Sequence, residues 1–524
     1  MSLKISFKRL TIIHPILFAA FPILSFFSFN TRELLFEEIF LSLFLVLSLT
    51  IGIWFSLFYI LKNARKSAFI TSLLLVLFFS YGHVYNLIDN VTIAGLDIGR
   101  SRYLLVPFLA SLVVGVYYFI RTNRKLNNAT TITNFITVSL IIVASANIGM
   151  FYIADNENFY DDETIINYFS IMPDTESTFT KLVKSDLPDV YYIILDGYAG
   201  ANSLKEFSNF DNQEFITFLN DQGFYVHSQS YSNYPETPTS MAATLNMQYV
   251  NKLADIVGTD LDSMHPTFKL IQENLVMKNF KSKGYTLVGF NTDIIHLDES
   301  KFDFYYCESD TIFDNKVMKS MLNLSIIGYF IEKIGYQEFR DEILCMFSEL
   351  PETKNIDEPT FVYAHFNMPH TPYIFSANGE PVNPSRAEQV NLQHFGSYAN
   401  ISDYINYLKF ANNETQKLVE KLLDTNDPPI IIIHSDHGTP FGLDWENPTN
   451  DMLRQRLSNF QAFYLPNGDS GLMSEATTSV NIFRVLFNSY FNENYEILTD
   501  KIFWVLWNKP YDFKDITNVL IVEN

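Results

Sequence analysis

Ile430-Ile-Ile-Ile-His-Ser-Asp-His-Gly438 is the stretch that decides the fold class of this chain. Four consecutive β-branched apolar residues predict a strand buried on both faces, as in a parallel sheet. The strand ends abruptly in polar residues, and ligands of open α/β sheets bind at the carboxyl ends of the strands. An aspartate and a histidine placed there offer oxygen and nitrogen donors to a metal ion. Asp436 and His437 are therefore predicted metal ligands.

The composition of the whole chain points to two environments. The 524 residues are 48% hydrophobic, yet they carry a formal net charge of -22. A single soluble globule does not explain both values, whereas a lipid-embedded part joined to an acidic soluble domain does. The excess of acid also argues against a nucleic-acid partner, which needs a basic surface.

The N-terminal third contains five apolar stretches, each close to the roughly 20 residues that a helix needs to cross a bilayer. They lie at about residues 12–28, 39–61, 68–88, 103–120 and 129–154. Residues 1–154 are therefore predicted to be a transmembrane anchor of about five helices. The alternative, that the first stretch is a cleaved signal peptide, is disfavoured because no small-residue cleavage site follows it.

Basic residues predict the orientation of this anchor. Three basic clusters precede the first stretch, follow the second and follow the fourth, so all lie on one side, and positive charge marks the cytoplasmic side. The clusters are Lys4, Lys8 and Arg9; Lys62, Arg65 and Lys66; and Arg121, Arg124 and Lys125. The N-terminus is then cytoplasmic, and everything after residue 155 is extracytoplasmic. No acid or base stands out inside the stretches, which favours an anchor over a pump or a channel.

The rest of the chain divides into a linker and a large domain. Residues 155–187 are polar and lack sustained periodicity, which is typical of a juxtamembrane linker. In residues 188–524, strands are predicted at 190–195, 285–290, 360–365 and 430–434, and helices at 203–220 and 401–423. This alternation predicts an α/β domain with a mostly parallel central sheet covered by helices on both faces.

The two cysteines, Cys307 and Cys345, both fall in the predicted extracytoplasmic domain. They would form a disulfide in an oxidising compartment, but the sequence leaves the bonded and the free state open. Neither has the spacing of a metal site.

Asp196 ends the first predicted strand, in Pro188-Asp-Val-Tyr-Tyr-Ile-Ile-Leu-Asp-Gly197. Its place matches that of Asp436, so two carboxylates are expected at one edge of the sheet. The ordinary alternative for an aspartate after a strand is a helix cap.

A hydroxyl-rich loop, Tyr231-Ser-Asn-Tyr-Pro-Glu-Thr-Pro-Thr-Ser240, leads into a short predicted helix. Hydroxyls in such a place are usually helix caps, which is the plain interpretation of Thr237, Thr239 and Ser240. The N-terminus of a helix also attracts phosphate or sulfate, and a hydroxyl there becomes a nucleophile if a metal or base lowers its pKa.

Two histidines follow one another closely in Phe361-Val-Tyr-Ala-His-Phe-Asn-Met-Pro-His-Thr-Pro-Tyr373. His365 ends a predicted strand, and His370 lies in the proline-flanked turn after it. A lone histidine is more often structural. Two of them at the end of a buried strand are as consistent with a functional role, as a ligand or a transition-state contact, as with a structural one.

Together these four segments resemble the alkaline phosphatase superfamily. The likeness is to its membrane-anchored sulfatase-like branch, which includes lipoteichoic acid synthases and phosphoethanolamine transferases. It covers roughly residues 188–510, and Ser-Asp-His-Gly and Pro-His-Thr-Pro-Tyr are its most specific parts. By this resemblance the metal ligands are Asp196, Thr237, Asp436 and His437, the catalytic residues are Thr237 (with Thr239 as second choice) and His370, and the substrate-binding histidines are His365 and His370.

The chain departs from the sulfatase pattern around the nucleophile. Sulfatases have a Cys or Ser followed by a Pro-Ser-Arg pattern, whereas this chain has Thr237 and, in the place of the arginine, Met241. This argues against sulfate-ester hydrolysis as the native reaction. The two-metal members of the superfamily need further ligands after Asp-His-Gly, and none is obvious between Thr439 and Leu465, so one metal ion is expected.

The sequence therefore predicts a metal-dependent phosphotransferase or phosphodiesterase of the cell envelope that acts on a lipid-linked phosphodiester. Mn²⁺ and Zn²⁺ suit the mixed donors best, with Mg²⁺ and Ca²⁺ as weaker choices. Asn291 and Asp293 follow the strand at 285–290 and are predicted to line the substrate pocket. Two alternatives stay open: a sulfatase or other ester hydrolase, and a catalytically inactive surface scaffold. The sequence predicts no oligomeric state.

Overall fold

Strand β3 (Val190–Leu195) lies in the middle of a seven-stranded sheet and is buried along its whole length. The strand order is β4-β11-β9-β3-β8-β6-β7. β3 pairs in parallel with β9 (Ile430–His434) on one side and with β8 (Thr360–Phe366) on the other. The carboxyl ends of these three strands therefore meet at one edge of the sheet, where the polar residues of each follow.

The outer strands complete a mostly parallel sheet, as the sequence predicts. β6 (Thr286–Phe290) and β7 (Phe304–Tyr306) continue the parallel order beyond β8. β11 (Gln461–Tyr464) and β4 (Tyr225–Val226) run antiparallel at the other edge. In the same part of the chain, two small antiparallel pairs accompany this sheet: β5 (Ser230–Tyr231) with β10 (Ser458–Asn459), and β12 (Phe503–Leu506) with β13 (Lys509–Asp515).

The chain forms two units, one of residues 1–157 and 310–335 and the other of residues 158–309 and 336–524. The sheet belongs to the second unit. The computed structural model describes residues 11–31, 34, 36–88, 92–93, 96–97, 101–157, 162–170, 187–292, 297–308, 316–384 and 400–521.

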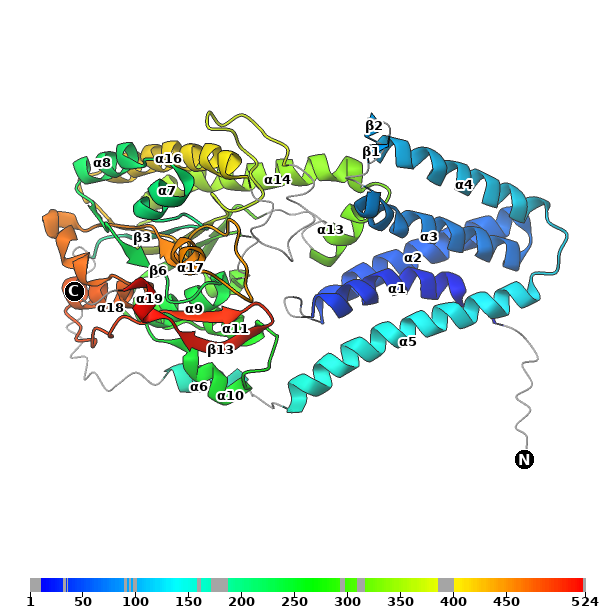
Figure 1. Cartoon of the computed structure of the whole chain (residues 1–524), viewed down its shortest axis with the longest axis horizontal. Coiled ribbons are helices and arrows are strands. Elements are labelled where there is room, and N and C mark those ends of the chain that lie inside the picture. The colour runs from blue at the N-terminus through cyan, green and yellow to red at the C-terminus, as the bar shows by residue number, and fades with distance from the viewer. Residues whose placement is uncertain are drawn as a thin grey trace. The chain divides into compact units, whose positions relative to one another are not determined.

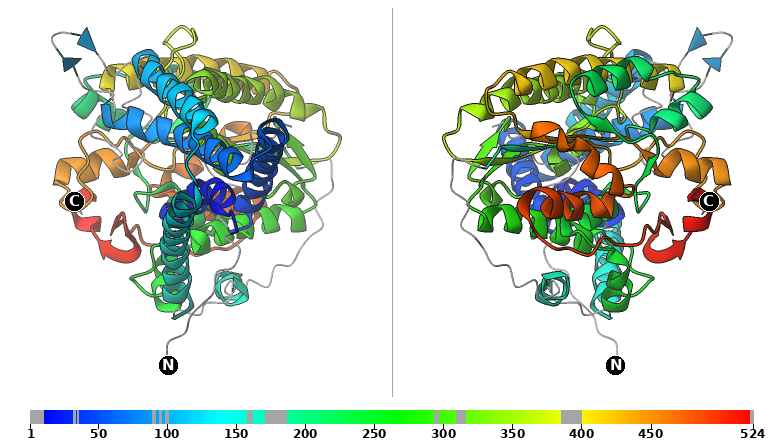
Figure 2. Two further views of the ribbon diagram at one scale, coloured as in Figure 1. Left: turned by 90° about the vertical axis from the view of Figure 1, so that its right-hand side faces the viewer. Right: turned by 90° about the vertical axis from the view of Figure 1, so that its left-hand side faces the viewer.

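Helices cover both faces of the sheet. They do so because successive residues of β3 point to opposite faces and both sets of side chains are apolar. Tyr191, Ile193 and Leu195 face one core, which is covered by α7 (Ala201–Ser208), α8 (Gln213–Asp221), α14 (Gly328–Glu349) and α16 (Ile401–Leu423). Val190, Tyr192 and Ile194 face the other, which is covered by α9 (Thr237–Asn246), α10 (Leu253–Val257), α11 (His265–Gln272), α12 (Leu275–Ser282) and α18 (Ile482–Phe491). The two layers lie on opposite sides of the sheet in Figures 1 and 2.

The remaining helices of this unit are short. They are α6 (Asp162–Ser170), α17 (Asn450–Leu457), α19 (Thr517–Leu520) and the 3₁₀ segments Val250–Lys252, Glu299–Lys301, Leu350–Asn355, Pro466–Glu475 and Ser479–Asn481.

The single helix predicted at 203–220 is wrong, because the chain turns within it. Asn209 adopts a left-handed conformation, with φ of 49°, and caps α7. Asn212, buried before α8, donates from Nδ2 to the Tyr198 hydroxyl at 2.8 Å. Asparagine tolerates the left-handed region better than most residues, so the break follows from these two side chains.

The segment predicted as a linker contains helix α6 (Asp162–Ser170). Ile165 and Phe169 of this helix are buried in the core, where α6 packs against α11. The part of the predicted linker from 171 to 186 lies outside the described residues.

Within its described residues, the first unit has four helices that are long and apolar enough to cross a membrane. They are α2 (Glu38–Leu61), α3 (Ala64–Ile88), α4 (Ser101–Arg121) and α5 (Asn127–Glu157), with the short pair β1 (Thr92–Ile93) and β2 (Leu96–Asp97) between α3 and α4. The first predicted span corresponds to α1 (His14–Phe29), an apolar helix of only 16 residues. Large apolar side chains such as Phe44, Phe55 and Phe135 are two-thirds exposed or more, as expected of helices that face lipid.

The ionisable side chain of His14, which was not singled out from the sequence, is buried in this unit. His14, at the start of α1, has its Nδ1 2.6 Å from the Ser72 hydroxyl oxygen of α3. The side-chain oxygen of Asn134, on α5, accepts from the His14 backbone N–H at 3.1 Å. These contacts connect three apolar helices through polar groups, as is common inside membrane bundles.

A segment from the middle of the chain packs into the membrane unit. Helix α13 (Lys316–Asn323) buries Val317 and Met321 against the core of α1 and α3. The backbone after it bonds to one turn of α3: Ile326 N–H donates to the Phe78 carbonyl at 3.0 Å, and Gly82 N–H donates to the Leu324 carbonyl at 3.0 Å. Figure 1 shows α13 beside α3. Residues 316–328 are thus part of the first unit, although strands of the seven-stranded sheet precede and follow them.

Cys307 and Cys345 are joined in a disulfide, which closes a loop of 38 residues around this segment. The structure therefore contains the bonded one of the two states that the sequence left open.

Gly82 is predicted to be indispensable for this packing. A Cβ atom at Gly82 would lie 2.5 Å from the Leu324 carbonyl oxygen, whereas Gly52 on α2 has open space around it. Gly82→Ala should therefore destabilise the protein by about 1–3 kcal/mol through overpacking. Gly52→Ala, the matched control, should be neutral or slightly stabilising because alanine favours helix. Thermal unfolding in detergent micelles measures both, and a Gly82→Ala protein as stable as the control would contradict the prediction.

Candidate metal centre and active site

Asp196 lies directly after β3 and is almost completely buried. Its backbone N–H donates to the Phe366 carbonyl at 3.1 Å, which continues the pairing of β3 with β8 by one residue beyond the strand. The carboxylate does not cap a helix, and its Oδ1 has no hydrogen-bond partner among the described residues. A fully buried carboxylate oxygen without a donor requires a positive partner.

Asp436 and His437 follow β9 and are also buried. Ile194 of β3 is level with His434 of β9, so Asp436 comes level with Asp196 two residues further on. Asp436 Oδ1 accepts from the Gly197 N–H at 3.1 Å, which fixes one side of its carboxylate. His437 Nδ1 lies 2.9 Å from the Gly438 carbonyl oxygen and donates to it, so the neutral ring carries a lone pair on Nε2.

Thr237 opens helix α9 and faces this pair. Its hydroxyl donates to Asp436 Oδ2 at 2.6 Å and lies 3.1 Å from His437 Nε2. Ser240, one turn further along α9, donates to the Asp436 backbone carbonyl at 2.7 Å and so ties the helix to the strand end. Thr239 is turned away, because its hydroxyl donates to the Glu236 carbonyl at 3.0 Å.

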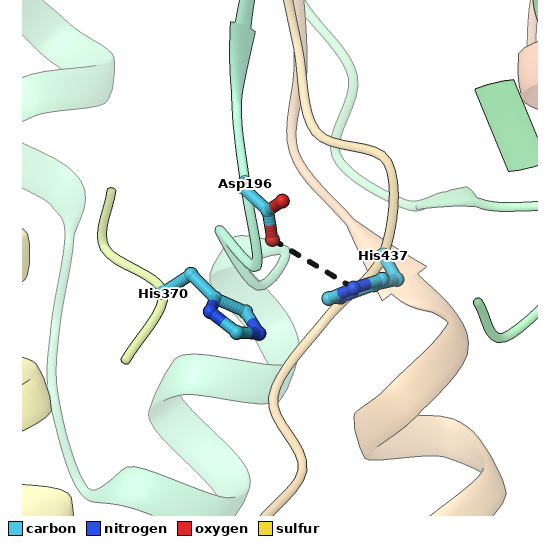
Figure 3. Close-up of side chains that lie close together, drawn as sticks. All are labelled: Asp196, His370 and His437. Atoms are coloured by element: carbon cyan, nitrogen blue, oxygen red, sulfur yellow. Dashed lines mark ion pairs between the residues drawn. The ribbon is translucent and has the colours of Figure 1, made fainter. Parts of the chain in front are cut away.

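His365 and His370 approach from the strand on the other side of β3. His365 is buried, and its Nε2 lies 3.3 Å from Asp196 Oδ2 without the alignment of a hydrogen bond. His370 is half-buried in the turn after β8, and its Nδ1 donates to the Thr371 carbonyl at 2.7 Å. Figure 3 shows Asp196, His370 and His437 pointing toward one another from three segments of the chain.

The donor atoms of these residues converge on one place. His437 Nε2 lies 3.3 Å from Asp436 Oδ2 and 3.7 Å from Asp196 Oδ1. Donor atoms of Asp196, His370 and His437 lie within 4.8 Å of one another, and so do those of Asp196, His365 and Asp436. Because most of these atoms present lone pairs and the Thr237 hydroxyl supplies one proton, a cation fits at their centre.

The charges around the cluster make the same point. Asp196, Glu236 and Asp436 are buried here, and Arg456 is the buried cation beside them. Among the described residues, the two aspartates alone outnumber this guanidinium, so the cluster keeps an excess of negative charge. Such an excess is costly to bury without compensation, and a bound cation would offset it.

The pKa shifts agree with a site ready to bind a cation. Burial on its own would raise the pKa of Asp196, but His370, followed by His365 and His437, holds that pKa below its ordinary value. Burial lowers the pKa of His437 to about 4, and Arg456 acts in the same direction. At neutral pH Asp196 is therefore ionised and His437 is neutral, which are the forms that bind metal.

One predicted residue, Asn291, makes no contact with the cluster in the described part of the chain. Asn291 lies at the carboxyl end of β6, and its backbone N–H donates to the Tyr306 carbonyl at 3.0 Å. Among the described residues no contact connects Asn291 with the donor atoms. Asp293 lies outside the described residues.

Two buried groups next to the cluster, Arg456 and His434, were not predicted from the sequence. Arg456 comes from α17, where neighbouring charges suggest a solvent-exposed face, so no local signal marks it as buried. His434, the last residue of β9, forms a second layer below the cluster: its Nδ1 lies 2.9 Å from the Tyr192 hydroxyl and its Nε2 2.9 Å from the Ser479 hydroxyl. The sequence signal that could have identified His434 is its position directly after four isoleucines, at the end of a predicted buried strand.

A family model described as Sulfatase matches residues 188–500. This match covers more than half of the chain, so the protein belongs to the sulfatase family. The resemblance of its motifs to the alkaline phosphatase superfamily is thereby confirmed, and the protein is a sulfatase-like enzyme. No curated protein matches the chain.

The chain is also similar to solved structures of low identity. One is the C-terminal periplasmic domain of EcEptC from Escherichia coli, with a TM-score of 0.42 and 14% identity over 63% of this chain and 93% of that one. Another is the C-terminal periplasmic domain of phosphoethanolamine transferase EptC from Campylobacter jejuni, with a TM-score of 0.37 and 12% identity over 60% and 92%. A third is the integral membrane protein lipooligosaccharide phosphoethanolamine transferase A from Neisseria meningitidis, with a TM-score of 0.34 and 10% identity over 89% and 94%.

We predict that a divalent ion stabilises the folded protein through the buried carboxylates. Saturating Mn²⁺ or Zn²⁺, at about 100 times its Kd, should add about 2.7 kcal/mol to the free energy of unfolding, and chelation should remove this gain. Asp436→Asn should abolish most of the effect, whereas the exposed Asp427→Asn serves as a matched control and should keep it. Thermal unfolding with and without metal measures the change. An equal metal response in both variants would place the ion elsewhere.

Proposed function

We propose that this protein is a metal-dependent phosphotransferase or phosphodiesterase of the cell envelope that uses Thr237 as its nucleophile. The observation that carries the proposal is the hydroxyl of Thr237, 2.6 Å from Asp436 Oδ2 and 3.1 Å from His437 Nε2, within a buried set of metal donors. Of the two threonines at the start of α9, only Thr237 contacts these donors, since Thr239 bonds to the backbone of Glu236.

The start of α9 suits an anionic substrate. Thr237 is the first residue of this ten-residue helix, whose aligned peptide dipoles place partial positive charge at its N-terminus. A phosphoryl group bound there lies beside the hydroxyl that would attack it.

The proposed metal ligands are Asp196, Asp436, His437 and the Thr237 oxygen, with Mn²⁺ or Zn²⁺ as the ion. When bound, such an ion lowers the pKa of a neighbouring hydroxyl and neutralises charge on the phosphoryl group. Thr237 Oγ then attacks the phosphorus, and its proton moves along the existing hydrogen bond to Asp436 Oδ2. The bond between phosphorus and the leaving alcohol breaks, which leaves a phosphothreonine.

His370 is the proposed general acid. Its Nδ1–H is held by the Thr371 carbonyl, so exchange of a proton with substrate would take place at Nε2, on the side of the cluster. In its protonated form it gives that proton to the departing oxygen. His365 lies deeper, and we assign it to binding a phosphoryl oxygen. An acceptor alcohol or water then attacks the phosphothreonine and gives its proton to His370 Nε2, and Thr237 recovers its own proton from Asp436 Oδ2.

A lipid-linked phosphodiester is the proposed donor, with the catalytic domain on the extracytoplasmic side. The support is the chain itself, since four helices long enough to cross a membrane precede the catalytic unit. The disulfide Cys307–Cys345 agrees with an oxidising compartment. Sulfate-ester hydrolysis is the second candidate, but the residue four positions after Thr237 is Met241, which is buried in the apolar core and offers no charge to a sulfate.

Replacement of Thr237 should abolish turnover. With a chromogenic phosphodiester and added Mn²⁺ or Zn²⁺, Thr237→Ala should lower kcat by roughly 10³-fold or more, because the nucleophile is lost. Thr239→Ala removes an equally small hydroxyl from the same helix turn and should keep most of the activity. The opposite result would make Thr239 the nucleophile, and an active Thr237→Ala enzyme would refute the proposal.

The acceptor separates transfer from hydrolysis. If the phosphothreonine is attacked by an alcohol, adding a simple primary alcohol at rising concentration should convert the released product from free phosphomonoester into the phosphodiester of that alcohol, while consumption of donor continues. Product analysis by mass spectrometry measures the ratio. A ratio of phosphodiester to phosphomonoester that does not change with the alcohol concentration would indicate a hydrolase.

A further inference from the structure

Arg456 is a buried guanidinium next to the cluster that the reaction described above does not use. It lies near the end of α17 and is only 6% exposed. Its charged neighbours are Asp436, Asp196 and Glu236. Trp445 lies across its guanidinium, with 5.7 Å from Cζ to the ring centroid. A fully buried arginine is retained only where its hydrogen bonds and charge are satisfied, so each of its contacts is informative.

The side chain of Arg456 connects the two loops that carry the reacting groups. Its Nε donates to the Pro235 carbonyl at 2.7 Å, two residues before Thr237. Its Nη1 lies 3.4 Å from the Gly438 carbonyl oxygen, one residue after His437. One rigid planar group thus contacts both the loop of the nucleophile and the loop of the metal ligands.

The backbone of α17 holds the second loop from the other side. The Gly438 N–H donates to the Arg456 carbonyl at 2.7 Å, and a Cβ atom at Gly438 would lie 2.1 Å from the Gln455 carbonyl oxygen. The loop therefore lies directly on the end of the helix, with no room for a side chain. The Ser232 N–H likewise donates to the Leu457 carbonyl at 2.9 Å, so the nucleophile loop begins on the same helix end.

We propose that Arg456 is a positioning residue that sets the distance between the Thr237 hydroxyl and the Asp436–His437 pair. This inference rests on the proposed function, in which Thr237 attacks phosphorus. Without the guanidinium the Pro235 carbonyl loses its donor, and the contacts that remain with this end of α17 lie earlier in the loop, at Ser232 and in the pairing of Tyr231 with Ser458. The effect falls on turnover and not on metal affinity, because removing a cation from beside the carboxylates does not weaken their hold on a divalent ion.

The test compares Arg456→Met with Arg454→Met in the full-length protein. Arg454 lies on the same helix two residues earlier, but its side chain is 44% exposed and pairs with Asp451 and Glu206, so its loss is the matched control. Arg456→Met should lower kcat by about 100-fold, the cost of a misplacement near 1 Å, with KM close to wild type and the Kd for Mn²⁺ unchanged or lower. Arg456→Lys, whose single ammonium cannot reach both carbonyls, should regain part of the loss. Free guanidinium should likewise restore activity to Arg456→Ala.

Hydrogen exchange provides a readout that needs no turnover and no metal. Amides of residues 236–240 should exchange faster in Arg456→Met than in Arg454→Met, while amides of the central strands stay protected. Unchanged exchange in a folded Arg456→Met protein overturns the inference, as does wild-type kcat or a loss that saturating Mn²⁺ fully repairs. If the wild-type protein turns over no phosphodiester at all, the proposed function fails, and the exchange experiment still decides whether Arg456 holds the loop. If Arg456→Met does not fold, Arg456→Lys carries both measurements.

Discussion

Asp196 and Asp436 are held at the ends of two parallel strands that are buried on both faces, and this burial of charge constrains everything around them. The effective cost of burying an unpaired carboxylate is several kcal/mol, so each oxygen must find a donor or a cation. One oxygen of Asp436 takes the Gly197 N–H and the other the Thr237 hydroxyl, while Asp196 Oδ1 has no donor among the described residues. The buried carboxylates are therefore fully compensated only when a positive ion is bound. Because the strand ends place these carboxylates, the sheet itself creates the need for a cation at this site.

The same strands explain how the site keeps its geometry. Donors at the ends of β3, β8 and β9 are fixed by the register of a buried parallel ladder, which is more rigid than a surface loop. Thr237 is different, because it arrives on a loop and a helix from outside the ladder. Its place depends on individual contacts, namely Ser240 with the Asp436 carbonyl and the Pro235 carbonyl with Arg456. Catalysis that requires sub-ångström placement is thus most sensitive where the loop, and not the sheet, sets the distance.

The sequence predicted those parts whose signal is local. The strand of four isoleucines, the strand before Asp196 and the long helix at 401–423 are each found where their apolar patterns indicated. The strand ends then brought Asp196, Asp436 and His437 together, as parallel topology requires. The burial of Arg456 had no local signal, since it depends on how α17 packs. Residues 316–328 were also unpredictable, because only tertiary packing places them with the membrane helices.

The identity of the metal and the role of the two histidines are coupled. Asp196, Asp436 and Thr237 offer oxygen and His437 offers nitrogen, and such an oxygen-rich set suits Mn²⁺ at least as well as Zn²⁺. If His365 and His370 also bound the ion, the set would become rich in imidazole and would favour Zn²⁺, but neither histidine would then be left to protonate the leaving alcohol. The donor atoms lie close enough for either arrangement. If His370 instead contacts the substrate, the ion must be one that binds well to mainly oxygen donors. Identifying the bound ion therefore also indicates which groups remain for acid catalysis.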